Sequence, residues 1–593
     1  MGSQRAYTTH PLVLRRVTVR RVYEVTPRMR RVVLGGDGLA AFTRDGTVHP
    51  AFAAPGFDDH IKLILAADGN IQAALPAQLP HGIEWTPAEH RLTRDYTPRR
   101  VDLQRGELHL DFVVHGEGPA ETWSASAREG DELWFVGPKS SLRLPEQLDW
   151  ILLVGDETAL PAIGRFLDER PLDATAHVLV TVPDDSARQE LALRDGDTIT
   201  WVVAEPGEAA ALDAAVRALP VPAGEGYAWA AAESRALLLV RRYLQRERKL
   251  PKDRLNITGY WHREEATAPE TEGTADVGAV ARNPTGSRIP SPLPWLAARA
   301  ALQLGVVDTV ADTPGIPAGA LATRLGVPGP GIDVLLPLLA AYDVVVSAGD
   351  GTGLRLGPAG EELLDDHERE EYTGHEAELL LALAHFAPAL RDGMSPWRLA
   401  SGTTLHHTVT HDAERYGELV EECEQLVFLL HGLTADRLWE DVGSCLLTGP
   451  GSASVVAALD DAGRRPRLRI AEDATPVTVL RGHVPAPERI DWTPGPVDVA
   501  VAAKALAHRT DQEATLLLTR LAGWTRTAVL VEASRPDGLS PYAAESALHA
   551  YGATGSPLRD AAAIAAVAKR SGWDVDRTIA LGWGAEATVL RRT

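Results

Sequence analysis

The sequence contains very little cysteine: Cys423 and Cys445 are the two thiols in 593 residues. Two cysteines cannot form a disulfide framework, and their separation matches neither a zinc nor an iron–sulfur ligand pattern. The cysteines therefore predict no resident metal site. Any redox chemistry in this chain would need a bound organic cofactor.

Long apolar runs are also missing. The opening stretch MGSQRAYTTHPLVLRRV lacks the apolar core of a signal peptide. No window of the sequence reaches the roughly 20 apolar residues that a helix needs to cross a bilayer. These two absences predict a cytoplasmic protein without a membrane partner.

Positive charge is scarce, because 59 lysines and arginines face 81 acidic residues and leave a net charge of −22. This excess repels phosphate backbones and argues against a general nucleic-acid binder. Arginines nevertheless gather at the start of the chain, either as a solvated strand face or as a patch for an anionic ligand. These arginines are Arg5, Arg15, Arg16, Arg20, Arg21, Arg28, Arg30 and Arg31.

The chain does have the length and composition of a multidomain globular protein. Hydrophobic residues make up 45% and charged residues 24%, which supplies packed cores and leaves no room for extensive disorder. Its length allows roughly four domains of about 150 residues each. Changes in pattern place the expected domains at 1–148, 149–265, 291–440 and 441–593, with a linker rich in Pro, Gly and Glu at 266–290.

Short alternating patterns fill the first 148 residues. The stretch ELHLDFVVHG places Leu108, Leu110 and Phe112 on one strand face, which predicts an antiparallel β-barrel. From residue 150 the pattern becomes WILLVGDETALPAIGRFLDE, an uninterrupted apolar strand that breaks at Gly155 before a helix. This order is typical of a parallel sheet and predicts an α/β domain, with Ser234 as the N-cap of a later helix.

One short stretch, RDYTPR at residues 94–99, combines positive charge with an aromatic ring and a hydroxyl. On a strand Arg94 and Tyr96 share a face, and Pro98 then ends the strand. A flavin needs a ring to stack on, a hydrogen-bond partner near N5 and a guanidinium for its pyrophosphate. Arg94, Tyr96 and Thr97 supply these groups, so the stretch predicts a flavin site in the barrel.

Residues 94–99 also resemble the flavin signature of the siderophore-interacting proteins, NAD(P)H-dependent ferric-siderophore reductases related to ferredoxin reductases. The likeness continues in order over about residues 12–265, through DDHIKLIL, DFVVHGEGPAETW, GPKSSL, GDETALPAI, AAESRAL and GYWHR. It implies an FAD-binding barrel followed by a domain for NADPH or NADH. Two departures, GPK in place of GPR and His262 before Arg263, leave the type of siderophore open.

The resemblance assigns residues to both cofactors. HGEGPAETW is a turn and a helix start whose backbone amides would hold the FAD pyrophosphate, and GDETALPAI lies where a parallel strand meets its helix. The alternatives are that Trp123 packs in the core and that Asp156 and Glu157 are ordinary first-turn acids. The expected FAD residues are Arg94, Tyr96, Thr97, Asp111, Phe112, Val113, His115, Pro119, Ala120, Thr122 and Trp123. The expected NAD(P)H residues are Gly155, Asp156, Glu157, Thr158, Ala159, Glu233 and Ser234.

Lys62, Lys139 and Arg263 match positions that this family uses for a basic substrate site. Ferric siderophores are often anionic and surround their iron with oxygen ligands, so the site needs cations and no metal ligands of its own. Lys62 interrupts the apolar run IKLIL, where a buried amine is costly without an anion. Lys62 therefore points either into the site or to the surface.

The expected activity follows from the implied cofactors. NAD(P)H would give a hydride to the flavin, which would pass single electrons to iron(III) and release iron(II). Neither a general acid nor a general base is required. No catalytic side chain is therefore predicted in this half.

From about residue 294 the chain resembles small-molecule O-methyltransferases, which join a winged-helix dimerisation domain to a Rossmann-like domain for S-adenosylmethionine. LLTGPGSASVVAAL lies where that family has a glycine-rich run, and DVAVAAKALAHRTDQEA resembles its LHDW segment. The resemblance implies a homodimer and S-adenosylmethionine as a cofactor. His508 stands where some members have a base, although we interpret it as a packed or surface histidine. The candidate site residues are Gly449, Gly451, Glu472, Asp473 and His508.

Several residues depart from that pattern. Leu447 and Thr448 replace the acid that usually begins the loop, and Pro450 separates the glycines, which argues against a close approach of backbone to cofactor. The span 473–498 is also short for the usual strand and helix. The second half is either a degenerate domain kept for dimerisation or substrate holding, or a working methyltransferase. The latter would make the chain a bifunctional enzyme of natural-product biosynthesis.

A winged helix also suggests DNA binding. Residues 290–366 hold three arginines, Arg299, Arg324 and Arg355, against nine acidic residues. A surface that reads DNA needs the opposite sign of charge. The composition of this segment therefore argues against a nucleic-acid partner.

Overall fold

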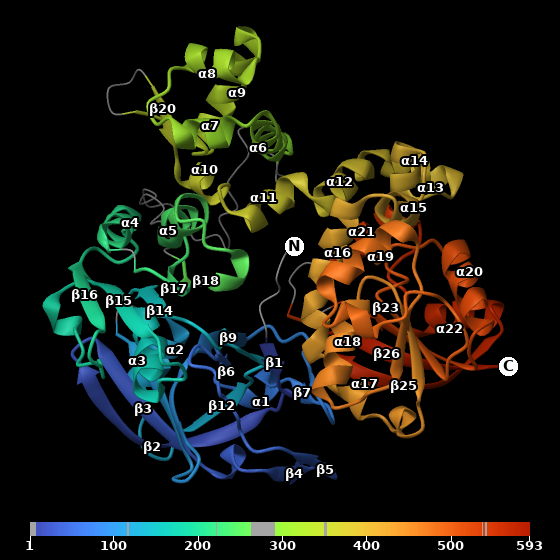
Figure 1. Ribbon diagram of the computed structural model, residues 1–593, viewed down its shortest axis with the longest axis horizontal. Coiled ribbons are helices and arrows are strands. Elements are labelled where there is room, and N and C mark those ends of the chain that lie inside the picture. Colours follow the sequence, from blue (N-terminus) through green and yellow to red (C-terminus); the bar gives the residue numbers. More distant parts are fainter. Residues whose placement is uncertain are drawn as a thin grey trace.

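The computed structural model describes residues 7–114, 118–220, 222–262, 291–348, 353–536, 538–539 and 543–593. The predicted linker at 266–290 lies outside these residues, and so do His115 and Arg263. Figure 1 shows a blue barrel and a green α/β domain on the left, and an orange and red α/β domain on the right. A yellow-green helical module lies above them.

The N-terminal barrel is antiparallel, as the alternating pattern predicts. Its strands are β1 (Tyr7–Thr9), β2 (Arg15–Thr26), β3 (Met29–Gly35), β4 (Phe42–Arg44), β5 (Thr47–His49), β6 (Ile61–Ala66), β7 (Ala77–Gln78), β8 (Ile83–Glu84), β9 (Arg91–Tyr96), β10 (Pro98–Asp102), β11 (Glu107–Val113), β12 (Glu132–Val136) and β13 (Ser140–Leu142), with helices α1 (Ile71–Ala74) and α2 (Pro119–Ser126). The main sheet has the order β10-β11-β3-β2-β12-β6-β9. The side chains of Leu108, Leu110 and Phe112 are fully buried in it.

The N-terminal arginines of the described residues are mostly engaged within the fold. Arg15 is buried and donates hydrogen bonds to the carbonyls of Gly38 (2.6 Å) and Pro50 (2.7 Å). Four of the others have an acidic partner, which argues against a patch of unpaired arginines for an anionic ligand. The ion pairs are Arg16–Glu132 (3.2 Å), Arg21–Glu107 (2.8 Å), Arg28–Glu157 (2.8 Å) and Arg31–Asp111 (2.5 Å).

The second domain has the predicted parallel sheet. Its strands are β14 (Trp150–Gly155), β15 (Thr175–Val182), β16 (Thr198–Val203), β17 (Gly226–Glu233) and β18 (Leu255–Trp261), and its helices are α3 (Leu160–Glu169), α4 (Ala209–Ala218) and α5 (Ala236–Arg242). The strand order is β16-β15-β14-β17-β18. The chain therefore reverses its winding direction between β14 and β17, and ligands bind at such switch points.

The expected N-cap at Ser234 is wrong, because α5 begins only at Ala236. The Ser234 hydroxyl instead donates to the carbonyl of Trp261 (3.2 Å). The amide of Ala236 donates to the carboxylate of Glu233 (2.8 Å). A buried acid therefore satisfies this helix end in place of the serine.

The helical module begins with helices and one hairpin. These are α6 (Leu293–Leu304), α7 (Val306–Asp312), α8 (Ala318–Leu325), α9 (Gly329–Ala341), β19 (Val345–Ser347), β20 (Leu354–Leu356) and α10 (Pro358–Glu362). The helices that follow are short, and Gly393 (φ 64°) and Gly402 (φ 81°) end two of them in the left-handed region. They are α11 (Asp366–Thr373), α12 (His375–Ala382), α13 (Phe386–Asp392), α14 (Pro396–Ser401), α15 (Leu405–Thr410), α16 (Ala413–Glu422), the 3₁₀ helix η7 (Cys423–Phe428) and α17 (His431–Ala435).

The C-terminal sheet has the order β22-β21-β23-β24-β26-β25. Its strands are β21 (Ser444–Thr448), β22 (Arg467–Ile470), β23 (Val499–Ala503), β24 (Thr527–Ala533), β25 (Trp573–Gly582) and β26 (Ala585–Arg592), and its helices are α18 (Ser452–Asp461), α19 (Ala474–His483), α20 (Asp511–Ala522), α21 (Ala543–Thr554) and α22 (Ala561–Arg570). The described residues between β22 and β23 form α19 and the 3₁₀ helix η9 (Pro487–Arg489) but no further strand. The sheet therefore stops one strand short of the Rossmann order, as the short span 473–498 indicates.

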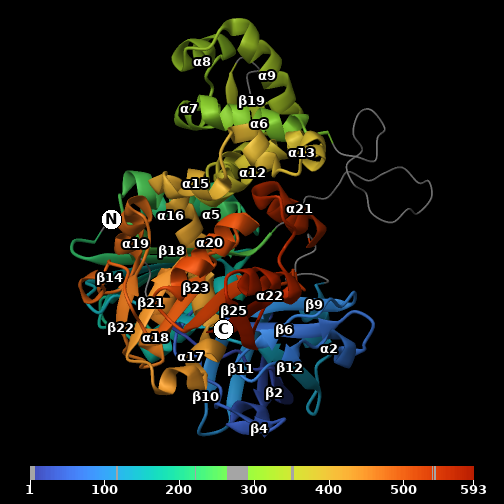
Figure 2. The ribbon, with the colours of Figure 1, turned by 90° about the vertical axis from the view of Figure 1, so that its right-hand side faces the viewer.

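The two halves meet through a hydrophobic cluster. The Trp583 indole packs edge-on against Trp85 of the barrel (6.1 Å between ring centroids) and against Phe428 of η7 (5.3 Å). Strand β25 also contacts β8. Figure 2 shows the molecule from this side, with the orange and red C-terminal half facing the viewer and the blue barrel next to it. Aromatic burial of this kind dominates interface stability. The cluster also contains Leu12, Leu14, Ile64, Ala74, Ile83 and Val136, with Leu539 packed on it.

Polar contacts fix the relative position of the halves. Glu84 of the barrel, which is buried, accepts hydrogen bonds from Arg535 (3.0 Å) and from the amide of Gly584 (3.2 Å). Arginines in α5, directly before it and in the π-helical turn after it (Tyr243–Glu247) pair with acids of the helical module. These ion pairs are Arg235–Glu362, Arg241–Asp365, Arg242–Asp312 and Arg246–Asp308.

Three histidines also meet at this interface. Burial, together with the nearby His10 and His81 of the barrel, lowers the pKa of His431, at the start of α17, to about 4. Below pH 6.5 the unfolded chain takes up this proton before the folded protein does. The free energy of unfolding should therefore fall as the pH drops from 6.5 towards 4.

We expect His431→Gln to reduce this acid sensitivity. Thermal unfolding at pH 7.5 and at pH 4.5 measures the drop in midpoint, which should be smaller in the variant than in the wild-type protein. His385→Gln, which changes an exposed histidine, is the matched control and should leave the drop unchanged. Equal drops in all three proteins would contradict the assignment.

Candidate active site

Tyr96 presents a half-buried ring at the end of β9. The ring lies 4.5 Å from that of Phe112 in β11, and Phe112 lies 5.7 Å from Trp123 of α2, measured between centroids. The β6–β9 register puts Arg94 and Tyr96 on the same face, as the sequence predicts. Burial raises the pKa of Tyr96 and keeps its phenol neutral. The arrangement offers a flavin one accessible aromatic surface.

A guanidinium and a helix start lie beside this ring. Arg94 is exposed and donates to the carbonyl of Thr93 (2.8 Å). Helix α2 begins at Pro119 and is capped by the Glu121 carboxylate, which accepts from the amide of Gly118 (3.2 Å). The charge of Glu121 contributes to the raised pKa of Tyr96, so the helix start and the ring are neighbours. An accessible cation and helix amides suit a pyrophosphate, and these residues therefore fit FAD.

Three predicted FAD residues lie under the site instead of facing it. Both carboxylate oxygens of Asp111 accept from Arg31 (2.5 and 2.7 Å), and this side chain is buried. Phe112 and Val113 are buried as well. Phe112 supports the Tyr96 ring from the barrel core, whereas Val113 packs in the core of the second domain. His115, also predicted, lies outside the described residues. The remaining predicted residues lie on α2: Pro119 and Trp123 are half-buried, Ala120 is buried and Thr122 is exposed.

Thr97 joins the barrel to the second domain. It is buried, and its side chain forms a hydrogen bond with Tyr260 of β18. Burial raises the pKa of Tyr260, whose ring also contacts Trp229 edge-on at 6.3 Å. Trp229 in turn donates to the Asp58 carboxylate (3.1 Å). The flavin-side threonine therefore sits at the junction of both domains.

The sequence patterns do not single out Asp58, Asp59 and Tyr260. Asp59 accepts from the amide of Gly56 (2.9 Å) and from Ser141 (2.8 Å), and burial raises its pKa to about 7. The only sequence signal is the position of these acids in DDH, directly before the strand IKLIL. Their partners lie far along the chain, so the pattern alone does not show that they are enclosed.

The predicted nicotinamide residues converge at the ends of β14 and β17, which are neighbouring strands. The buried Asp156 carboxylate accepts from the amide of Glu233 (3.1 Å), from Trp261 (2.8 Å) and from the amide of Thr158 (2.9 Å). Burial raises the pKa of Asp156. Asp156 therefore links the ends of β14, β17 and β18 through hydrogen bonds. Gly155 allows close packing there, since a Cβ would lie 2.6 Å from the carbonyl of Ala231. Of the other predicted residues, Ala159 is buried and Ser234 is half-buried at the edge of this site.

Glu157 couples the two domains. Its carboxylate accepts two hydrogen bonds from Arg28 in the β2–β3 turn of the barrel (2.8 and 3.0 Å). The Glu157 side chain is 8% exposed and that of Arg28 is 24% exposed. Glu157 is therefore neither a simple first-turn acid nor free to bind a ligand, but an interdomain clamp.

Two of the predicted substrate residues come together beside β9. Lys62 of β6 pairs with Asp95 (2.8 Å), and Lys139 follows β12, whose Val136 lies opposite Lys62. Burial lowers the pKa of Lys139, and the nearby Lys62 lowers it further, while Asp95 raises it. Lys62 therefore neither faces solvent freely nor lies in the core. Arg263, the third predicted residue, lies outside the described residues.

The glycine loop of the C-terminal half is closed by its own hydrogen bonds. The amide of Gly449 donates to Glu472 (2.5 Å), that of Gly451 to the carbonyl of Ala503 (3.1 Å) and that of Ser452 to the carbonyl of Gly449 (3.1 Å). Pro450 has no amide hydrogen. The N–H groups of residues 449–452 therefore all have partners within the chain, and the loop offers none of them to the carboxylate of S-adenosylmethionine. Asp473 is exposed at the start of α19.

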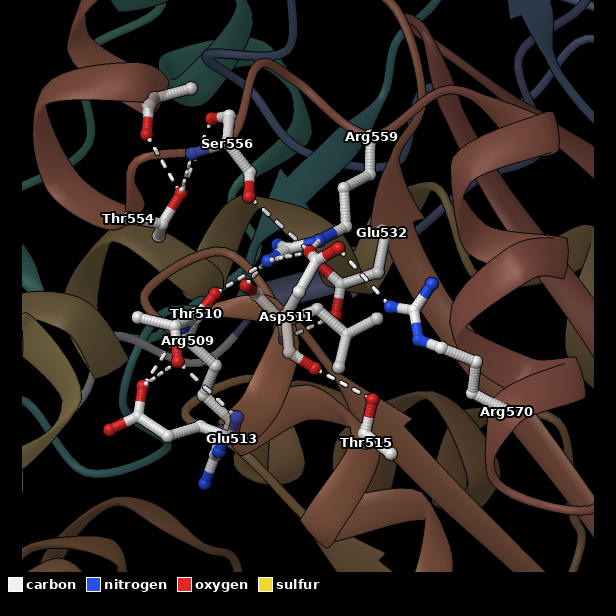
Figure 3. Close-up of polar contacts among 12 residues, drawn as sticks. Arg509, Thr510, Asp511, Glu513, Thr515, Glu532, Thr554, Ser556, Arg559 and Arg570 are labelled. Atoms are coloured by element: carbon white, nitrogen blue, oxygen red, sulfur yellow. Dashed lines mark hydrogen bonds and ion pairs between the residues drawn. The ribbon is translucent and has the colours of Figure 1, made fainter. Parts of the chain in front are cut away.

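His508 is buried and packs against His406 of α15, with 5.3 Å between ring centroids. Burial lowers its pKa well below the usual value. Figure 3 shows how the segment after His508 is held: Arg559 donates to the carbonyl of Arg509 (2.6 Å) and to the carboxylate of Asp511 (3.0 Å). These hydrogen bonds hold the chain directly after His508 in place, so the buried, neutral imidazole has a fixed position.

Comparison with known proteins identifies the N-terminal half. Residues 18–142 match the siderophore-interacting FAD-binding domain, and residues 148–264 match the siderophore-interacting protein domain. A protein of Escherichia coli (strain K12) named NADPH-dependent ferric-chelate reductase is 32% identical over 254 residues, which cover 42% of this chain and 94% of the relative. This chain belongs to the siderophore-interacting protein family.

Two solved structures resemble the two halves of this family member. A siderophore utilization protein from T. fusca is 35% identical and covers 45% of this chain and 99% of its own, with a TM-score of 0.40. An O-methyltransferase from neocarzinostatin biosynthesis is 19% identical and covers 54% of this chain and 100% of its own, with a TM-score of 0.42. The second likeness is too distant to say what the C-terminal half binds.

The described residues of this family member include neither a membrane-crossing helix nor a cluster of metal ligands. No helix among them is long and apolar enough to cross a membrane. The same residues hold no group of three or more histidine, cysteine or acidic side chains arranged for a metal ion.

We expect Arg28→Ala to destabilise the pair of N-terminal domains by about 2 kcal/mol, because it leaves a nearly buried carboxylate without its partner. Urea unfolding monitored by tryptophan fluorescence measures the change. Arg16→Ala removes a pair whose side chains are 59% and 51% exposed, and should have little effect. If both variants unfold alike, Glu157 is not a clamp.

Proposed function

We propose that residues 1–265 form a ferric-siderophore reductase that takes electrons from NADPH or NADH and delivers them through FAD to iron(III). One observation carries this proposal: the consecutive residues 95–97, at the end of β9, contact the proposed substrate site, the proposed flavin site and the second domain. Tyr96 presents its ring beside α2, Thr97 bonds to Tyr260 of the second domain, and Asp95 holds Lys62. A flavin seated on Tyr96 would lie between the nicotinamide and substrate sites.

FAD, when bound, accepts two electrons as a hydride and releases them singly, which suits an acceptor that takes one electron at a time. Arg94 and the start of α2 bind its pyrophosphate, and Tyr96 orients its ring. Thr97, whose side chain bonds to Tyr260, would place the edge of this ring against the second domain. None of these side chains transfers a proton, in keeping with a reaction that needs no general acid or base.

The cofactor and substrate assignments have independent support. The E. coli relative is named as NADPH-dependent, which favours NADPH for this chain. A ferric chelate is the acceptor that suits the Lys62 and Lys139 pair, because two amines favour an anion and offer iron(III) none of its preferred oxygen ligands. We place this activity in the cytoplasm.

We further propose that the C-terminal half is a degenerate methyltransferase-like module and not a second enzyme. The closed glycine loop and the missing outer strand support this proposal over a bifunctional biosynthetic enzyme. Helices α6 to α9 and the β19–β20 hairpin have the element order of a winged helix. Exposed apolar side chains on α6 and α9, Leu293 (58%) and Val334 (75%), suit a homodimer contact.

Purified protein should be yellow and should release iron(II) from a ferric siderophore when supplied with NADPH or NADH. An iron(II) chelator under anaerobic conditions measures the product. Tyr96→Ala should lose most bound FAD and at least tenfold of the rate, because the flavin loses its stacking surface. Tyr342→Ala, at an exposed tyrosine of the helical module, is the control. If the purified protein is colourless and does not bind added FAD, the proposed reductase function is refuted.

Isothermal calorimetry with S-adenosylmethionine should give no heat of binding up to millimolar concentration. The reason is that the amides of the glycine loop already have partners within the chain. Binding in the micromolar range would overturn the degenerate-module proposal and favour a working methyltransferase.

A further inference from the structure

Lys139 is an unusual cation, because its direct partners belong to the other half of the chain. Its ammonium donates to the side-chain oxygen of Gln425 (2.9 Å), 286 residues away, and lies 5.2 Å from the centre of the Phe428 ring. Both partners are on η7. We propose that η7 forms one wall of the site that binds the ferric chelate, with Gln425 and Phe428 as specificity-determining residues. This inference rests on the proposed reductase function.

The geometry of η7 separates its inward and outward side chains. In a 3₁₀ helix, residues three apart lie on the same face. Cys423 and Leu426 are buried, whereas Gln425 is exposed and Phe428 is half-buried. The second pair is therefore the face that η7 turns towards Lys139.

The C-terminal half holds η7 rigidly. The carbonyl of Cys423 accepts from the Ser454 hydroxyl of α18 (2.6 Å), and Phe428 packs on Trp583. Leu426 packs over the glycine loop, since a Cβ on Gly451 would lie 3.0 Å from it. The closed loop thus supports η7, which gives a methyltransferase-like domain a part in iron reduction without methyl transfer.

The charge balance indicates which ligand the site takes. Lys62 has Asp95 as its counter-ion, whereas no carboxylate of the described residues lies within ion-pair distance of Lys139. The direct partners of Lys139 are a neutral amide and an aromatic face, and Asp95, which acts on it from farther away, is already paired with Lys62. The Lys139 charge is therefore only partly compensated in a partly desolvated place. The site therefore favours an anionic iron chelate over a neutral one.

The test uses the full chain with FAD bound. We compare Gln425→Ala, Gln425→Glu and Phe428→Ala, with Gln512→Glu at an exposed position of α20 as the matched control. The probes are ferric EDTA, an anion, and ferric tris(acetohydroxamate), which is neutral. Flavin reduction by NAD(P)H is followed separately by absorbance, and thermal midpoints establish that each variant folds.

Gln425→Glu should raise the KM for ferric EDTA at least tenfold by pairing with Lys139, and should leave the KM for the neutral chelate within about twofold. Gln425→Ala and Phe428→Ala should raise the KM for the anion about fivefold with little change in kcat. The control should match wild type. Flavin reduction should be unchanged in every variant, because the nicotinamide site is untouched.

Binding of gallium(III) EDTA, which accepts no electrons, gives a second readout by calorimetry. Its Kd should weaken in the same order as the KM values for the anion. Unchanged KM and Kd in all three η7 variants would overturn the inference while leaving the reductase intact. If the wild-type protein reduces neither chelate and binds no gallium complex, the proposed function fails and the inference falls with it.

Discussion

Side-chain alternation along residues 94–97 is the constraint on which the candidate site depends. Tyr96 and Asp95 point to opposite faces of β9, because successive strand residues must do so. Tyr96 therefore packs on Phe112 at the barrel core, while Asp95 pairs with Lys62 on the other side. The proposed flavin site at Tyr96 and the proposed substrate site at Lys62 are therefore close together because neighbouring residues of β9 contact both. No mobile element is needed to bring them together.

The second domain is held against this strand by buried polar contacts. Glu157 binds Arg28 of the barrel, and Tyr260 binds Thr97. Asp156 fixes the strand ends from which Glu157 projects. Because these groups are enclosed, each is costly to leave unpaired, and the relative position of the two domains is well determined.

The C-terminal half packs against both N-terminal domains and forms a second interface with them. Trp583 and Phe428 bury apolar surface against the barrel, and the charged contacts of α5 attach the helical module to the other N-terminal domain. A large apolar contact together with ion pairs distinguishes this joint from a loose tether. The C-terminal sheet carries this joint, because Trp583 lies between β25 and β26 and packs on both Trp85 and Phe428 of η7.

The sequence by itself determined the elements whose signals are local. The alternation of Leu108, Leu110 and Phe112 was enough to predict the barrel, and the apolar run ending at Gly155 was enough to predict the parallel sheet. The order of residues 94–97 was enough to place Arg94 and Tyr96 on one strand face. The short span 473–498 likewise indicated a shortened sheet. Each of these follows from periodicity and turn chemistry within about 20 residues.

Only the tertiary structure decided how charges and hydrogen bonds are paired. In the folded chain Asp111 binds Arg31, Glu157 binds Arg28, Glu472 binds the amide of Gly449 in the glycine loop, and Lys139 binds Gln425. The tertiary structure also replaced the expected cap at Ser234 by Glu233. These partners lie far apart in sequence, and a side chain's partner depends on which surfaces pack together, which no local pattern records.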